Sequence, residues 1–115
     1  GHTFAHAIEI ASDHAVRHGE AVAMGLVAAS NLSARLGHCS VALQNRIEAA
    51  LEATALPTLI PGNVSPDRLF KAMGSDKKKK AGRLRFVLLR DIGDVFVTDA
   101  VNEQAVRDTL EVLIV

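Results

Sequence analysis

The sequence has 115 residues, which predicts one domain built around one core. Hydrophobic residues make up 49% and charged residues 23%, as in a globular rather than a disordered protein. The formal net charge is zero, so no global positive field argues for nucleic acid, and no apolar stretch reaches the roughly 18 residues of a membrane helix. The single cysteine, Cys39, excludes an internal disulfide framework and favours a reducing, cytoplasmic location.

Two helices are predicted in the first third of the chain. Over residues 2–11, Phe4 and Ile8 define an apolar face at helical spacing. A second helix is expected from about 18–36, and its many small residues allow another helix to approach its backbone closely. Gly37 is expected to close this helix, because glycine commonly follows helix C-termini.

Two further helices are predicted in the middle of the chain. Ser40 is a candidate N-cap for the first of them. The residues expected to form its buried stripe are Leu43, Ile47, Ala50 and Leu51. The second is expected to begin at Ser65-Pro66-Asp67, which offers a capping hydroxyl, a first-turn proline and an acid at the positive end of the helix dipole. This helix is expected to be short and to end near Gly74.

A β-hairpin and a final helix are predicted in the last third. Residues 83–86 alternate polar and apolar and residues 86–89 are all apolar, which predicts a strand buried at its far end. Residues 92–94 are typical of a turn, and residues 95–97 predict the second strand. A last helix is expected from about Glu103. The residues on its apolar face are Val106, Leu110 and Leu113. The predicted fold class is mainly α, a multi-helix domain with a small β-hairpin.

Four of the five histidines crowd the start of the chain: His2, His6, His14 and His18. His2 and His6 are one helical turn apart, the spacing at which two imidazoles can face one ion or one ligand. A helix that begins at His18 could fold back and add a ligand from its first turn. The cluster predicts a metal or catalytic site on a helical hairpin, although a single histidine is more often an ordinary surface or capping residue.

The third ligand of such a site is left open by the spacing. A catalytic zinc ion usually takes three protein ligands and keeps one open position. The candidates are Glu9, Glu20, another histidine, or a group outside this chain. No His-Glu-x-x-His sequence is present, which excludes the common zinc-protease helix.

Three blocks of the sequence resemble the 3-dehydroquinate synthases. Residues 1–9, GHTFAHAIE, resemble the GHTFGHAIE signature of that family. Residues 18–25, HGEAVAMG, resemble its HGEAVAxGM segment, and residues 76–93 match its DKK…G…RFVLL…IG block. The blocks occur in family order. Ala5, where many members have glycine, departs from the pattern, and we expect tolerance because alanine adds only a methyl group and is the better helix former.

The resemblance implies roles for the matching residues. His2 and His18 match the two histidine ligands of a zinc or cobalt ion, whose third ligand in the family is a glutamate upstream of this chain. His6 matches a histidine near the departing phosphate that is implicated in substrate binding and proton handling. Lys77 or Lys78 matches a lysine that reaches the anionic groups of the substrate.

The resemblance also implies an activity. Members of the family are NAD- and metal-dependent, phosphate-eliminating carbon–oxygen lyases of the shikimate pathway, which leads to chorismate and the aromatic amino acids. They convert 3-deoxy-D-arabino-heptulosonate 7-phosphate to 3-dehydroquinate and phosphate. The family's N-terminal NAD-binding domain is absent from this chain. Residues 1–115 are therefore expected to form a single C-terminal metal- and substrate-binding domain, inactive alone, of a cytoplasmic homodimer that binds neither nucleic acid nor membrane.

Three alternatives remain at this point. A sister sugar phosphate cyclase that makes deoxy-scyllo-inosose or epi-valiolone would share the fold, the metal and NAD, but residues 4–7 and 85–89 favour dehydroquinate synthase. A metal-dependent polyol dehydrogenase also carries metal-binding histidines on a helical domain, but the DKK block argues against it. A non-catalytic helical binding module would tolerate replacement of His2 and His18.

Overall fold

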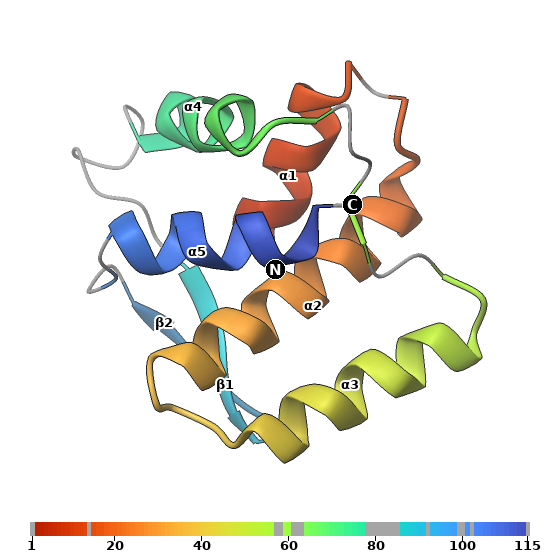
Figure 1. Ribbon diagram of the computed structural model, residues 1–115, viewed down its shortest axis with the longest axis vertical. Coiled ribbons are helices and arrows are strands. Elements are labelled where there is room, and N and C mark those ends of the chain that lie inside the picture. Colours follow the sequence, from red (N-terminus) through yellow and green to blue (C-terminus); the bar gives the residue numbers. More distant parts are fainter. Residues whose placement is uncertain are drawn as a thin grey trace.

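The computed structural model describes residues 2–13, 15–56, 59–60, 64–77, 86–91, 93–98, 101 and 103–114, and of residues 2, 3, 66 and 74–77 only the backbone. The elements in chain order are α1 (His2–Ala11), α2 (His18–Arg35), α3 (Val41–Ala53), α4 (Pro66–Lys77), β1 (Phe86–Asp91), β2 (Asp94–Thr98) and α5 (Glu103–Leu113) (Figure 1). The described strands form one two-stranded antiparallel sheet. The predicted class, mainly α with a small hairpin, is therefore confirmed.

The core forms where α1, α5 and β1 pack against α2, and α4 packs in turn on α1 and α5. Phe4 and Ile8, the predicted apolar face of α1, are both buried. The Phe4 ring lies 5.5 Å from that of Phe86, centroid to centroid, and tilted against it. Small buried residues of α2, among them Ala21 and Ala28, belong to the same cluster. The small-residue surface of α2 therefore lets the bulky side chains of its neighbours approach closely.

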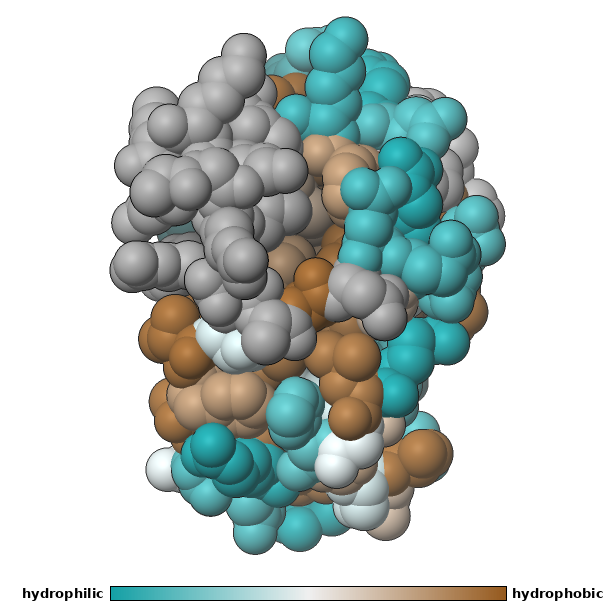
Figure 2. All heavy atoms as spheres, turned by 90° about the vertical axis from the view of Figure 1, so that its left-hand side faces the viewer, coloured by the Kyte–Doolittle hydropathy of each residue, from teal (hydrophilic) through white to brown (hydrophobic). Residues whose placement is uncertain are grey.

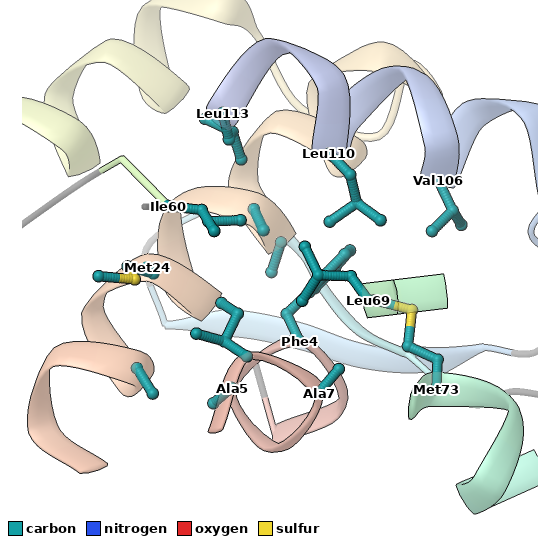
Figure 3. Close-up of a cluster of buried hydrophobic side chains, with 14 of the residues drawn as sticks. Phe4, Ala5, Ala7, Met24, Ile60, Leu69, Met73, Val106, Leu110 and Leu113 are labelled. Carbon is teal, nitrogen blue, oxygen red and sulfur yellow. The ribbon is translucent and has the colours of Figure 1, made fainter. Parts of the chain in front are cut away.

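Helices α4 and α5 supply the rest of the buried hydrophobic side chains of this core (Figure 3). The predicted apolar face of α5 is confirmed, because Val106, Leu110 and Leu113 are buried. Leu69 and Met73 of α4 fill the space between α5 and α1. The core therefore binds the first helix of the chain to the last.

The helix ends follow the predicted capping residues. Gly37 has a φ of +82°, and its N–H donates to the carbonyl of Ala34 at 3.1 Å, while His38 donates to Ser33 at 2.9 Å. These two bonds form a Schellman motif that satisfies the last carbonyls of α2. At the start of α3, the Ser40 hydroxyl accepts from the N–H of Leu43 at 3.1 Å. Ser65 caps α4 in the same way, accepting from the N–H of Arg68 at 3.1 Å.

Two details of the predicted helices are wrong. In the expected buried stripe of α3, Leu43 is buried and Ile47 and Leu51 are half-buried, but Ala50 is exposed. The reason is that α3 lies along one edge of the molecule and packs chiefly against α2 (Figure 1). The fourth helix does not end near Gly74 but continues to Lys77, because lysine favours helix and its charge suits a helix C-terminus.

The hairpin has the predicted two strands and turn. Leu88 pairs with Phe96, and the register shifts between Leu89 and Asp91, next to the turn residue Gly93, whose φ is +82°. The predicted start of the strand at residues 83–85 lies outside the described residues. Large exposed hydrophobic residues on the hairpin are Val87, Val95 and Val97. On the side of the molecule shown in Figure 2, hydrophobic residues gather in the middle of the view, with hydrophilic residues above and below them.

A polar contact at the surface ties α5 to α4. The Arg107 guanidinium donates to Asp67 at 2.8 Å and to Glu103 at 3.3 Å, and it lies 4.6 Å from the centre of the Phe70 ring. The hydrogen bonds that Arg107 donates to Asp67, the larger effect, and to Glu103 raise the pKa of its guanidinium. Within the described residues, no helix combines the length and apolar character needed to cross a membrane.

Candidate metal site at the turn between α1 and α2

The turn that joins α1 to α2 is shaped by Ser12. Its hydroxyl donates to the carbonyl of Glu9 at 3.2 Å and accepts the N–H of Val16 at 3.3 Å. Asp13 adopts the left-handed conformation, with a φ of 54°, which reverses the chain direction. As a result, the first residue of α2, His18, lies beside the last turn of α1.

A close contact joins the two arms of this turn. Nδ1 of His18 lies 2.8 Å from Oε1 of Glu9, with the histidine side chain 73% exposed and the glutamate side chain 20% exposed. An ionised carboxylate only accepts hydrogen bonds, so the bonded Nδ1 carries the hydrogen. Among the described residues, Nε2 of His18 has no hydrogen-bond partner. The ring therefore presents one free nitrogen to solvent, which is the arrangement a metal-binding histidine requires.

The second acidic candidate, Glu20, has a different task. Its Oε1 accepts the backbone N–H of Arg17 at 3.2 Å, just before the first turn of α2. A carboxylate there satisfies a donor at the helix start and complements the helix dipole. Both acids that the spacing offered as ligands therefore have partners already, Glu9 a ring nitrogen and Glu20 the backbone.

The other predicted site histidines lie on α1. His2 is its first residue, with only its backbone described, and His6 follows one turn later with an exposed side chain. His6 and Glu9 share the side of α1 that faces away from Phe4 and Ile8. His14 lies outside the described residues. The side chains that the structure describes include no group of three or more His, Cys, Asp or Glu residues able to hold a metal ion. The pairing of His2 with His18 stays a prediction.

Of the two predicted substrate lysines, the structure describes only the backbone of Lys77. Lys77 is the last residue of α4, a helix that packs against α1, and its side chain is not described. Lys78 lies outside the described residues. Their role in binding substrate therefore stays a prediction.

Sequence reasoning missed the hydrogen bond between Glu9 and His18. Glu9 was considered as a ligand, but the spacing of nine residues across an unformed turn does not show which atom a carboxylate contacts. Ser12 is the one signal of a tight reversal, because a serine hydroxyl often bonds to nearby backbone in such turns.

The fold is similar to that of a sugar phosphate cyclase. The fold superposes with a TM-score of 0.85 on the 2-epi-5-epi-valiolone synthase of Streptomyces hygroscopicus subsp. jinggangensis 5008, a structure with NAD⁺ and Zn²⁺ bound. The match covers 97% of this chain and 31% of the synthase, with 27% sequence identity.

Sequence comparison narrows this class to one family. Residues 1–79 match the family model of the 3-dehydroquinate synthase C-terminal domain, and the chain belongs to that family. It is 48% identical over 112 residues to the 3-dehydroquinate synthase of Acidithiobacillus ferrooxidans and 46% identical over 116 residues to that of Paracoccus denitrificans. Each match covers 96% of this chain but only 30% and 32% of the two relatives.

Proposed function

We propose that this chain is the metal- and substrate-binding part of a 3-dehydroquinate synthase, which converts 3-deoxy-D-arabino-heptulosonate 7-phosphate to 3-dehydroquinate and phosphate. One observation carries the proposal: the family match over residues 1–79 contains all the predicted site residues. These are His2, His6, His18, Lys77 and Lys78. A cytoplasmic location, an NAD-binding N-terminal domain and a homodimer of the longer protein belong to the same proposal.

In this proposal His2 and His18 hold Zn²⁺ or Co²⁺. One described donor supports this assignment: Nδ1 of His18 is occupied by Glu9, which leaves Nε2 for the ion. The third ligand comes from a glutamate outside this chain. When bound, the metal supplies a Lewis acid for the oxygens of the substrate, and NAD⁺ supplies the transient oxidation.

The remaining site residues handle protons and charge. His6 is exposed on the same arm of the turn as Glu9, and we propose that its imidazole acts as the general acid or base. Lys77 or Lys78 provides a positive point charge for the phosphate or carboxylate of the substrate. The chain thus orients the substrate and moves its protons.

A chimera tests the proposal. The C-terminal third of the Acidithiobacillus ferrooxidans enzyme is replaced by this chain, with which it shares 48% identity. The chimera is expected to release phosphate from the heptulosonate phosphate with no net formation of NADH. A chimera that folds and binds NAD⁺ but releases no phosphate would contradict the proposal.

Variants of the chimera assign the roles. His6→Ala is expected to lower kcat by about 10²–10⁴-fold, the usual contribution of a general acid–base group. His18→Ala is expected to abolish activity together with zinc binding. Glu111→Ala, on the exposed side of α5, is the matched control and leaves the activity unchanged.

The isolated chain is expected to be inactive, since it matches a C-terminal family model and covers only 30% of the Acidithiobacillus ferrooxidans relative. The measurement is phosphate release by the chain alone with the heptulosonate phosphate, NAD⁺ and Zn²⁺. Turnover above the rate without protein would show that the chain needs no further domain.

A sister cyclase is the second candidate, supported by the likeness to the valiolone synthase. The identity of 46–48% to 3-dehydroquinate synthases, compared with 27% to the valiolone synthase, favours the first proposal. Assays of the intact protein that carries this chain against the sugar phosphates of both classes distinguish them by kcat/KM.

A further inference from the structure

We infer that Glu9 is a positioning residue for His18: its carboxylate holds the imidazole in the Nδ1–H form and turns Nε2 outward as the atom that binds the metal. The inference rests on the proposed function, since it assigns a task to a neighbour of a proposed ligand. It gives Glu9 a role different from that of a direct metal ligand.

The contact has the geometry of such a support. The Nδ1 to Oε1 distance is 2.8 Å, that of a strong charge-assisted hydrogen bond. The two nitrogens of an imidazole point to different sides of the ring, so a carboxylate on Nδ1 lies away from an ion on Nε2. Protonation of Nδ1 leaves a lone pair on Nε2, the form in which a neutral imidazole binds a metal.

Glu9 is also the better anchored of the two partners. Its side chain is 20% exposed, compared with 73% for His18. It lies on α1, which is fixed to the core by the adjacent buried Ile8, and its own carbonyl accepts a hydrogen bond from Ser12. His18, by contrast, is the first residue of α2. The orientation of the histidine ring is therefore set by the glutamate.

The tautomer of His18 provides the first test. In the metal-free chain labelled with ¹⁵N-histidine, the ring nitrogen shifts above the titration range report which nitrogen carries the hydrogen. We expect Nδ1–H in the wild type and Nε2–H, the form favoured in water, in Glu9→Ala. The control Glu111→Ala should keep the wild-type pattern, and circular dichroism verifies that each variant folds.

Zinc affinity provides the second test, measured by calorimetry on the same chain. Loss of such a supporting partner typically lowers metal affinity 10–100-fold, so Glu9→Ala is expected to weaken binding by about that factor. Glu9→Gln keeps an oxygen that can accept from Nδ1–H and should lose less. Glu111→Ala should bind as the wild type does.

The outcomes separate this inference from the proposed function. If His18→Ala weakens zinc binding but Glu9→Ala changes neither the tautomer nor the affinity, the inference is wrong and the proposed ligand stands. If Glu9→Ala weakens binding while His18 keeps the Nδ1–H form, Glu9 is a direct ligand and the inference is again wrong. If His18→Ala binds zinc as the wild type does, the proposed metal site fails, and the inference falls with it.

Discussion

The buried hydroxyl of Ser33 joins two elements that lie far apart in the sequence. It donates to the carbonyl of Ala29 at 2.6 Å and accepts the N–H of Leu89 at 3.1 Å, which attaches β1 to α2. Ser30 is equally buried but donates only to the carbonyl of Val27, at 2.9 Å within the same helix. The two serines therefore form a natural matched pair.

Ser33→Ala is expected to lower the free energy of unfolding by about 1–3 kcal/mol, because the buried N–H of Leu89 loses its acceptor. Ser30→Ala should cost less, since the carbonyl of Val27, which loses the hydroxyl of Ser30, still accepts a backbone hydrogen bond within the helix. Urea denaturation of both variants measures the difference. Equal losses would show that the contact with Leu89 contributes nothing.

Cys39 gives a prediction that depends on pH. Burial, and then the charge of Asp91, raise the pKa of its thiol above the ordinary value of 9.0. The folded chain thus keeps a proton that the unfolded chain releases near pH 9.0. The stability contributed by the thiol is full below that pH and falls as the pH rises through the folded pKa.

The alkylation rate of Cys39 is expected to rise with a midpoint above pH 9.0 in the folded chain and near 9.0 in the chain unfolded in urea. Iodoacetamide labelling followed by mass spectrometry measures both profiles. Coincident midpoints would contradict the expected protection.

For the proposed site, the sequence names candidate residues but not the contacts that they make. His18 was singled out by its place at the start of a helix and by the family block that it opens. Its bond to Glu9 could not be predicted, because it depends on the reversal at Asp13 and on the side-chain angles of both partners. The partner of a residue is fixed by the fold, whereas its chemistry is already present in its side chain.

Among the elements, the helix ends depend on single residues, and Gly37 is the clearest case. Its φ of +82° places it in the left-handed region, and an added Cβ would meet nothing within 4 Å. Any cost of a larger residue there is conformational rather than steric. Gly19, in the first turn of α2, has equally open surroundings but no positive φ.

Gly37→Ala is therefore expected to destabilise the chain by about 1–2 kcal/mol, the cost of the left-handed conformation for an L-residue. Gly19→Ala should instead be neutral or stabilising, by up to about 1 kcal/mol, because alanine favours helix. Thermal unfolding of the two variants shows the sign of each change. A loss of stability in both would mean that the backbone at Gly19 is also constrained.

The apolar spacing predicted the faces of α1 and α5 correctly but overestimated that of α3. The spacing of Leu43, Ile47, Ala50 and Leu51 marks one side of a helix. It does not say whether a neighbour covers the whole of that side. In the structure α3 packs chiefly against α2, and this contact does not extend to Ala50, which is exposed. The length of α4 was underestimated because Gly74 was expected to end the helix. A glycine ends a helix only when the residues after it also disfavour helix, and here they do not.

For the molecule as a whole, the long-range packing could not be predicted from the sequence. One such long-range contact is the N–H of Ile60, which donates to the carbonyl of Leu113 at 2.8 Å at the end of α5, a helix that packs on α2. The apolar character of both residues is plain in the sequence, but their pairing requires the arrangement of every helix between them. The predicted fold class, mainly α, was correct because composition and apolar spacing determine which elements form. They do not determine how those elements pack.

Amide hydrogen exchange is expected to divide the molecule into two parts. In the second half of α2, every residue from 27–33 is buried, so its amides should exchange only through global unfolding. The amides of α3, which packs on one side only, should exchange faster through local opening. Mass spectrometry of peptides from the two helices measures the rates. Equal protection would show that α3 unfolds only with the core.

The bond between Glu9 and His18 has a consequence for the entropy of ligand capture. An exposed histidine at a helix start would ordinarily sample several rotamers, and fixing it on binding would cost conformational entropy. Here the 2.8 Å contact restricts the ring before any ligand arrives. The turn between α1 and α2 is therefore a preorganised half of a binding site, whose remaining ordering cost falls on the groups that approach it.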